Sequence, residues 1–118
     1  MSVKVYGIKN CNTMKKAFDF LQEKGVDYEF IDYKKQKPSK DLLKGFLKKT
    51  DLESLVNKKG TTYRKQSEET KEALNSTDQA LDILVENSSM IKRPVIVYPD
   101  GKLTLGFDSD EISKHLGQ

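Results

Sequence analysis

The residue best suited to do chemistry is Cys11, the only cysteine among 118 residues. It follows a strand-like run, Val3 to Ile8, and precedes a helix-like run that starts at Asn12. A thiol at a helix N-terminus lies near unpaired backbone N–H groups and the positive end of the helix dipole, and both favour the thiolate. Because the thiolate is the nucleophile, this position predicts a reactive cysteine. The alternative interpretation is a small buried hydrophobic residue, which is how most free cysteines behave.

The arginines are the second feature of chemical interest. The chain holds 21 Lys and Arg residues, and Arg64 and Arg93 are its two arginines. A guanidinium group offers a planar fork of donors that lysine cannot supply, and this fork suits carboxylates and oxyanions. An arginine in a lysine-rich chain therefore suggests anion contact, with chance placement as the alternative.

Composition limits the classes of protein to which the chain can belong. Charged residues make up 33% of it, both signs are interspersed, and the net charge is +3, which argues against a dedicated nucleic-acid binder. We find no apolar run near the ~20 residues that span a bilayer, and no secretion signal. One cysteine cannot form an internal disulfide, which fits a reducing cytoplasm. One cysteine and one histidine also exclude a structural zinc site.

The N-terminal third predicts a strand, a helix and a second strand. The run Val3 to Ile8 is short and apolar, as in a buried strand. Apolar residues then recur at helical spacing from Thr13 to Lys24, and Gly25 provides a C-terminal stop. A second strand is expected over Val26 to Asp32. This order implies a right-handed crossover and a parallel pair of strands.

The middle of the chain predicts helices alone. Ser39, Ser67 and Thr77 are candidate N-caps for three helices, a short helical turn is expected near Leu52, and residues 57–62 are expected to form a loop. Residues of about 38 to 88 therefore form an all-helical insertion within one domain that covers residues 1–118.

The C-terminal part returns to strands. A strand is expected at Val95 to Tyr98, a hairpin turn at Asp100–Gly101, an antiparallel strand at Lys102 to Leu105, and a last helix after Asp108. The whole order, βαβ followed by ββα with a mixed four-stranded sheet, is that of an α/β thioredoxin-like fold. In this fold a reactive cysteine sits where the first strand meets the first helix, which is the place of Cys11. Pro94, just before a strand, belongs at a strand start or in a cis bond.

Four stretches resemble the arsenate reductase (ArsC)/Spx family, in its YffB-like branch, and they occur in order along essentially the whole chain. They are Tyr6-Gly7-Ile8-Lys9-Asn10-Cys11-Asn12-Thr13-Met14-Lys15-Lys16-Ala17, Gly60-Thr61-Thr62-Tyr63-Arg64-Lys65, Ile91-Lys92-Arg93-Pro94-Val95 and Leu105-Gly106-Phe107. The resemblance implies that the cysteine faces a pocket with anion-binding arginines, at the positions of Arg64 and Arg93. It also implies that glutathione resolves an adduct on Cys11.

Two positions depart from the family pattern. Arsenate reductases carry an arginine where this chain has Phe107, which puts arsenate turnover in doubt. Spx regulators and thioredoxins carry a second, resolving cysteine where this chain has Met14. An adduct on Cys11 must therefore be cleared by an outside thiol, for which glutathione is the candidate.

Three neighbours of the thiol complete the expected site, with plainer alternatives left open. Lys9 is expected to lower the thiol pKa or to bind an anionic substrate, and an exposed lysine is the alternative. Asn12 and Thr13 are expected to offer backbone N–H groups to an anion, although ordinary helix capping also explains them.

The leading hypothesis is a glutathione-dependent thiol oxidoreductase that acts through Cys11 on a disulfide, an oxidised thiol or a small oxyanion. One alternative is an Spx-like transcriptional regulator that binds the RNA polymerase α subunit, and another is a genuine arsenate reductase. We expect a cytoplasmic monomer with glutathione as a co-substrate, no tightly bound cofactor, no metal, and no direct contact with nucleic acid or membrane.

Overall fold

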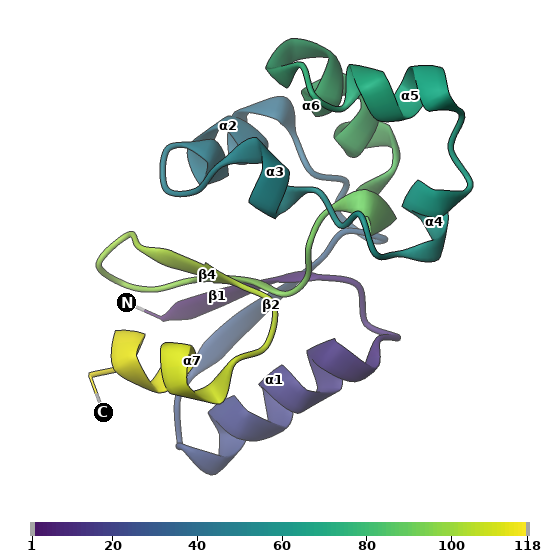
Figure 1. Cartoon of the computed structure of the whole chain (residues 1–118). Helices are drawn as coiled ribbons and strands as arrows, with labels where there is room; N and C mark the ends of the chain where they lie inside the picture. The colour runs from purple at the N-terminus through teal and green to yellow at the C-terminus, as the bar shows by residue number, and fades with distance from the viewer. Residues whose placement is uncertain (1, 118) are drawn as a thin grey trace. The chain divides into compact units, whose positions relative to one another are not determined.

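The computed structural model of the chain describes residues 2–117 (Figure 1). These residues form two compact units, which are treated separately below. The sheet unit contains residues 2–33 and 93–117, and the helical unit contains Lys34–Lys92. Within residues 2–117, no helix has the length and apolar character needed to cross a bilayer.

The sheet unit is built on a mixed four-stranded sheet in the order β2-β1-β3-β4. Its strands are β1 (Val3–Gly7), β2 (Tyr28–Asp32), β3 (Val95–Val97) and β4 (Leu103–Leu105). Strand β1 pairs in parallel with β2 and antiparallel with β3, and β3 pairs antiparallel with β4. The α/β thioredoxin-like sheet expected from the sequence is confirmed.

Two helices, α1 (Asn12–Glu23) and α7 (Ser109–His115), lie on the same face of this sheet (Figure 1). Alternate residues of β1 point to this face, which explains why the strand needs an apolar residue at every second position. The buried core between the helices and the strands consists of Val3, Val5, Met14, Ala17, Leu21, Ile96, Tyr98 and Ile112. Burial of this apolar set fixes the direction in which α1 leaves the sheet.

Local sequence fixes where the elements of the sheet unit end. Gly25 has a φ of +67°, a left-handed conformation that glycine adopts without strain, and it follows the last turn of α1. The Asp100 carboxylate accepts a hydrogen bond from the Lys102 N–H at 3.0 Å in the β3–β4 turn. The Asp108 carboxylate caps α7 by accepting from the N–H groups of Asp110 and Glu111 at 3.0 and 3.2 Å.

The helical unit contains short helices whose caps are largely those expected. Ser39 Oγ accepts from the Leu42 N–H at 3.0 Å, and Ser67 Oγ accepts from the Thr70 N–H at 3.1 Å. The elements are α2 (Lys40–Leu47), α3 (Leu52–Leu55), α4 (Thr61–Arg64), α5 (Glu68–Ala73), α6 (Thr77–Glu86) and the 3-10 turn η1 (Ser88–Met90).

Two local expectations for the helical unit are wrong. Residues 57–62 are not all loop, because α4 begins at Thr61. The cap of α6 is Ser76 and not Thr77, which is the first helical residue. A four-residue helix carries too little apolar periodicity to be recognised, and adjacent Ser and Thr residues are equivalent candidates by the capping rule.

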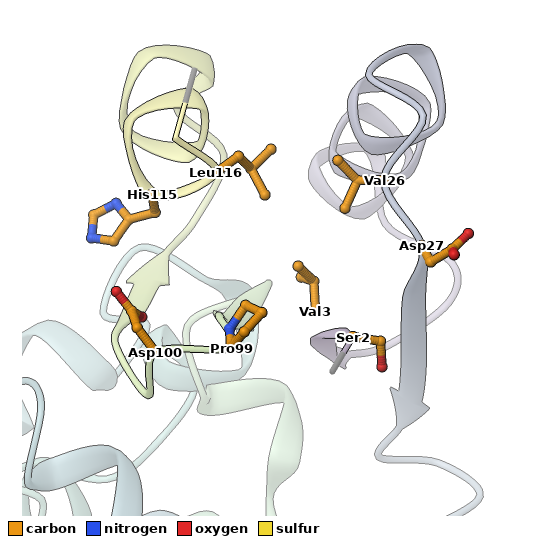
Figure 2. Close-up of a pocket in the computed structure, with 8 residues that line it drawn as sticks. All are labelled: Ser2, Val3, Val26, Asp27, Pro99, Asp100, His115 and Leu116. Carbon is orange, nitrogen blue, oxygen red and sulfur yellow. The ribbon is translucent and has the colours of Figure 1, made fainter.

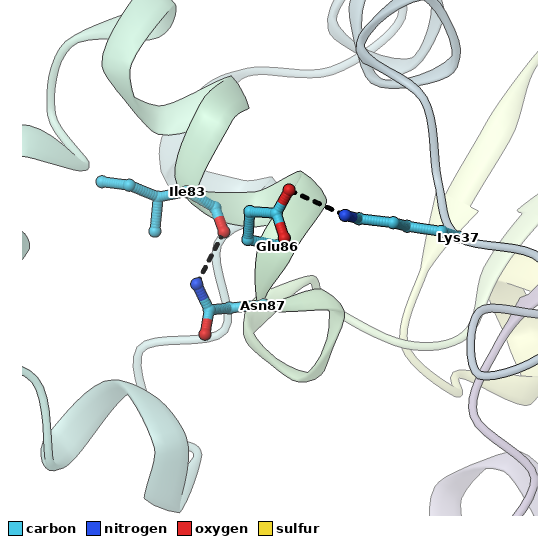
Figure 3. A network of polar contacts seen from close by, with 4 residues as sticks. All are labelled: Lys37, Ile83, Glu86 and Asn87. Carbon is cyan, nitrogen blue, oxygen red and sulfur yellow. Dashed lines mark hydrogen bonds and ion pairs between the residues drawn. The ribbon is translucent and has the colours of Figure 1, made fainter.

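Charged side chains join α6 to the segment that leads into α2 (Figure 3). Lys37 Nζ lies 2.7 Å from a carboxylate oxygen of Glu86, and Lys40 Nζ lies 2.5 Å from one of Asp82. Asn87 Nδ2 donates to the Ile83 carbonyl at 2.9 Å, and the same carbonyl accepts from the Asn87 backbone N–H at 2.9 Å at the end of α6. Both ion pairs are exposed, so each contributes little to stability.

Candidate functional site

Cys11 is the N-cap residue of α1. Its backbone is extended, with φ −147° and ψ 131°, and its carbonyl accepts the first helical hydrogen bond from the Lys15 N–H at 3.0 Å. The Cys11 N–H donates to the Lys9 carbonyl at 3.1 Å, which turns the chain between β1 and α1. The residue packs partly against the core and remains partly exposed. The sulfur is therefore held at the start of α1 and remains partly accessible to solvent.

Opposing effects act on the Cys11 thiol, and their sum lowers its pKa. Partial burial raises the pKa, but the Met14 N–H, the Arg93 side chain and the Thr13 N–H act as donors that lower it, and the charge of Arg93 adds to their effect. The sulfur makes no capping hydrogen bond of the short, well-aligned kind that serine makes. The backbone donors therefore act on it at longer range, as expected for a large, polarisable thiolate at an N-cap.

Sheet pairing brings Arg93 to the thiol. Tyr6 of β1 lies opposite Val95 of β3 in an antiparallel ladder, so the residues that precede Val95 lie beside the residues that follow Tyr6. Arg93 and Cys11 are therefore at the same end of the sheet. The Arg93–Pro94 bond is cis, and the buried Pro94 accepts a hydrogen bond from the Gly106 N–H at 2.9 Å.

The other expected site residues are placed as follows. Lys9 is exposed in the turn before Cys11, and Asn12 and Thr13 are the first two residues of α1. Arg64 is exposed at the end of α4, in the helical unit. Its role beside Cys11 stays a prediction, as do anion contacts by Lys9 and Asn12.

Sequence reasoning missed the part that Met14 plays at this site. We noted that it replaces a second cysteine, but its backbone N–H is also one of the donors to the Cys11 sulfur. Its side chain is fully buried in the core of the sheet unit. The capping rule contains the signal that could have found it, because the N–H groups of the second and third helical residues point toward the N-cap side chain.

A thiol at a helix N-cap, an arginine beside it and a proline before the next strand together prompt comparison with known proteins. The model of the ArsC family matches residues 6–115. The chain belongs to the ArsC family. It is 38% identical over 109 residues to a protein of Haemophilus influenzae, and the match covers 92% of this chain and 94% of that protein.

Solved structures of ArsC-family proteins agree in fold. A protein titled YffB has a TM-score of 0.91 at 36% identity, with 98% of this chain and 99% of that chain covered. An arsenate reductase (ArsC) related protein from Brucella melitensis has a TM-score of 0.75 at 41% identity, with 100% and 97% covered. The Listeria innocua protein titled global transcriptional regulator Spx is 24% identical over 118 residues, with 97% of this chain and 86% of that protein covered.

Phe107, which stands where ArsC-family arsenate reductases are expected to carry an arginine, is a packing residue here. Its ring meets that of Phe20 edge-on, with centroids 5.8 Å apart and an interplanar angle of 74°. Both rings pack against the core of the sheet unit. The space that an anion-binding side chain would need at this position is therefore used for aromatic contact.

A hollow of about 660 Å³ lies beside the start of β1, at the end of this strand away from Cys11 (Figure 2). It is lined by Ser2, Val3, Val26, Asp27, Pro99, Asp100, His115 and Leu116. His115 is held there by stacking on Tyr98, with ring centroids 4.9 Å apart. None of the expected site residues lines this hollow.

Among the residues that the structure describes, no group of three or more His, Cys, Asp or Glu side chains is arranged to hold a metal.

Proposed function

We propose that this chain is a glutathione-dependent thiol oxidoreductase in which Cys11 is the single nucleophile. The observation that carries the proposal is the pairing of a partly exposed sulfur with the Arg93 side chain and two helix N–H groups, which lower the Cys11 pKa against the effect of burial. A larger thiolate fraction near neutral pH increases the rate of thiol–disulfide exchange. Membership of the ArsC family supports the same chemistry.

The first step is attack of the Cys11 thiolate on the glutathione sulfur of a mixed disulfide. A Cys11–glutathione disulfide forms, the substrate's sulfur–sulfur bond breaks, and the substrate leaves as a thiolate that takes a proton from water. Arg93 stabilises the attacking thiolate before the step and contacts a glutathione carboxylate in the adduct.

The second step restores the enzyme. A glutathione thiolate attacks the glutathione sulfur of the adduct, which releases oxidised glutathione and returns Cys11 as a thiolate. The net reaction converts one mixed disulfide and one glutathione into one substrate thiol and one oxidised glutathione. An external thiol is needed because Cys11 is the only cysteine in the sequence.

A transcriptional regulator is the second candidate, because relatives titled global transcriptional regulator Spx match nearly the whole chain. Such a function would use a protein surface and would not need the sulfur. Binding of the RNA polymerase α subunit that is unchanged in Cys11→Ser would favour this candidate.

Mass spectrometry of the intact protein tests the proposal. After incubation with oxidised glutathione, we expect one glutathione per chain on Cys11, complete removal by reduced glutathione, and no adduct on Cys11→Ser. Steady-state reduction of a glutathionylated peptide, coupled through glutathione reductase to NADPH consumption, should depend on Cys11. A Cys11 pKa at or above 9.0, the ordinary value, or wild-type turnover no faster than that of Cys11→Ser, would refute the proposal.

A further inference from the structure

Gly7, the last residue of β1, lies against Met14 and Arg93, two of the residues whose donors lower the Cys11 pKa. A Cβ atom at Gly7 would lie 2.5 Å from Met14 Sδ, 2.7 Å from Met14 Cε and 3.5 Å from Arg93 Cβ. The Met14 N–H and the Arg93 side chain are hydrogen-bond donors to the thiol. Gly7 itself is buried, and its carbonyl accepts from the Tyr33 N–H at 2.8 Å, so its backbone is tied down.

The Met14 side chain is fully buried, in the same core cluster as Val5, Ala17 and Leu21. The atoms that the added Cβ would meet, Sδ and Cε, are the flexible end of this side chain, so they must shift to relieve a contact of 2.5 Å. Because they lie in a close-packed core, we expect part of this shift to reach the backbone that carries the side chain. For Met14 this backbone is the first turn of α1, which presents the N–H groups to the sulfur.

We infer that Gly7 is a positioning residue for the Cys11 nucleophile: the missing Cβ lets the Met14 side chain seat against β1, which sets the first turn of α1 at the distance where its N–H groups reach the sulfur beside Arg93. The inference deepens the proposed function, since it concerns the same sulfur. Gly7 touches neither the sulfur nor a substrate, and it acts through Met14.

The test compares the Cys11 pKa, measured from the pH dependence of thiolate absorbance, in wild type and Gly7→Ala. We expect the variant to raise the pKa by at least about 0.5, which means about threefold less thiolate at any pH well below it. Gly45→Ala is the matched control, because a Cβ at Gly45 meets nothing within 4 Å and this glycine lies in α2 of the helical unit. It should leave the Cys11 pKa unchanged.

A rescue variant separates positioning from a general loss of packing. Met14→Val removes both the Sδ and Cε atoms that the added Cβ would meet and leaves a smaller, apolar side chain in the core. In this background Gly7→Ala should fold and should shift the Cys11 pKa by less than about 0.2, a thiolate change below about twofold. If Gly7→Ala alone does not fold, the test is the comparison of Met14→Val with the double variant Gly7→Ala/Met14→Val.

Two results would overturn the inference and leave the proposed function intact. One is a low Cys11 pKa in wild type that Gly7→Ala, folded, leaves unchanged. The other is an equal rise in the Cys11 pKa with Met14 or Val at position 14, which would show that Gly7 does not act through Met14. An ordinary Cys11 pKa in wild type would overturn both the inference and the proposed function.

Discussion

The side chain of Arg93 donates a hydrogen bond to the sulfur of Cys11, although the helical unit, Lys34–Lys92, separates the two residues in the sequence. The antiparallel pairing of β1 with β3 creates this contact, because it sets the start of β3 beside the end of β1. The thiolate is therefore supported by two independent elements, the first turn of α1 and the loop before β3. Each can be altered without removing the other.

Replacement of Arg93 should weaken the nucleophile without unfolding the protein. We expect Arg93→Gln to raise the Cys11 pKa by about 1, because the positive charge beside the sulfur is lost and the shorter amide offers only a neutral donor. Arg93→Lys should show a smaller rise, since it keeps the charge. The measurement is the pH dependence of iodoacetamide alkylation of Cys11.

Lys102→Gln is the control for charge loss, since Lys102 is an exposed cation of the sheet unit in the β3–β4 turn. It should leave the alkylation profile unchanged. An equal effect of the two neutralising variants would show that the overall positive charge, and not Arg93, sets the thiol pKa.

The lowered Cys11 pKa also links folding to pH. A thiol with a lower pKa in the folded than in the unfolded protein binds fewer protons when folded, so its contribution to stability grows as pH rises from the folded pKa toward 9.0 and is absent below that window. The free energy of unfolding of wild type minus that of Cys11→Ser should therefore be larger at about pH 9.5 than at about pH 5.5. Urea denaturation at both pH values measures this difference, and a difference that is flat or falls with pH would contradict the assignment.

The serine caps of the helical unit should differ in what they contribute to stability. Ser39→Ala removes the acceptor of the Leu42 N–H and should cost about 1 kcal/mol of unfolding free energy. Ser76→Ala is matched to it, because Ser76 is also an N-cap but its side chain makes no capping hydrogen bond. We expect a change of a few tenths of a kcal/mol at most for Ser76. Equal losses in urea titrations would show that the Ser39 hydrogen bond is not what stabilises α2.

Restoring the arginine of arsenate reductases at position 107 should not create an arsenate reductase. Phe107→Arg removes the edge-on contact with Phe20, and we expect a loss of about 1–2 kcal/mol of stability, with a smaller loss for Phe107→Leu. Arsenate should not stimulate glutathione-coupled NADPH consumption by Phe107→Arg above the rate with Cys11→Ser. Stimulation by arsenate would show that position 107 decides the substrate.

Much of the fold could be predicted because its signals are local. Gly25 ends α1, Ser39 and Ser67 cap helices, and the apolar strand at 95–97 pairs antiparallel with the strand at 103–105, as expected. The short helix at Thr61–Arg64 could not be predicted, because four residues carry almost no periodicity. The cap of α6 was misplaced by one residue for an equally local reason, since Ser76 and Thr77 have the same capping chemistry.

The sequence predicts which residues form the site around Cys11, but it does not predict the distances and contacts between them. The position of Cys11 follows from the order of strand and helix. The place of Pro94 just before a strand made a cis bond one of two options, and the Arg93–Pro94 bond is cis. The contact between Gly7 and Met14 depends on how a helix packs on a strand, and no sequence spacing encodes a distance of that kind. For the same reason, the partnership of Arg64 with Cys11 stays a prediction.

The sheet unit is made of two segments of sequence, residues 2–33 and 93–117, and this has a consequence for folding during translation. On the ribosome, β1 and Cys11 emerge first, and the whole of Lys34–Lys92 must follow before Arg93 and β3 can join them. Strand β1 can therefore pair with β2 early, but it pairs with β3 only after residues 34–92 have been made. During that interval the nascent Cys11 lacks Arg93, so we expect its thiol pKa to be higher than in the folded protein.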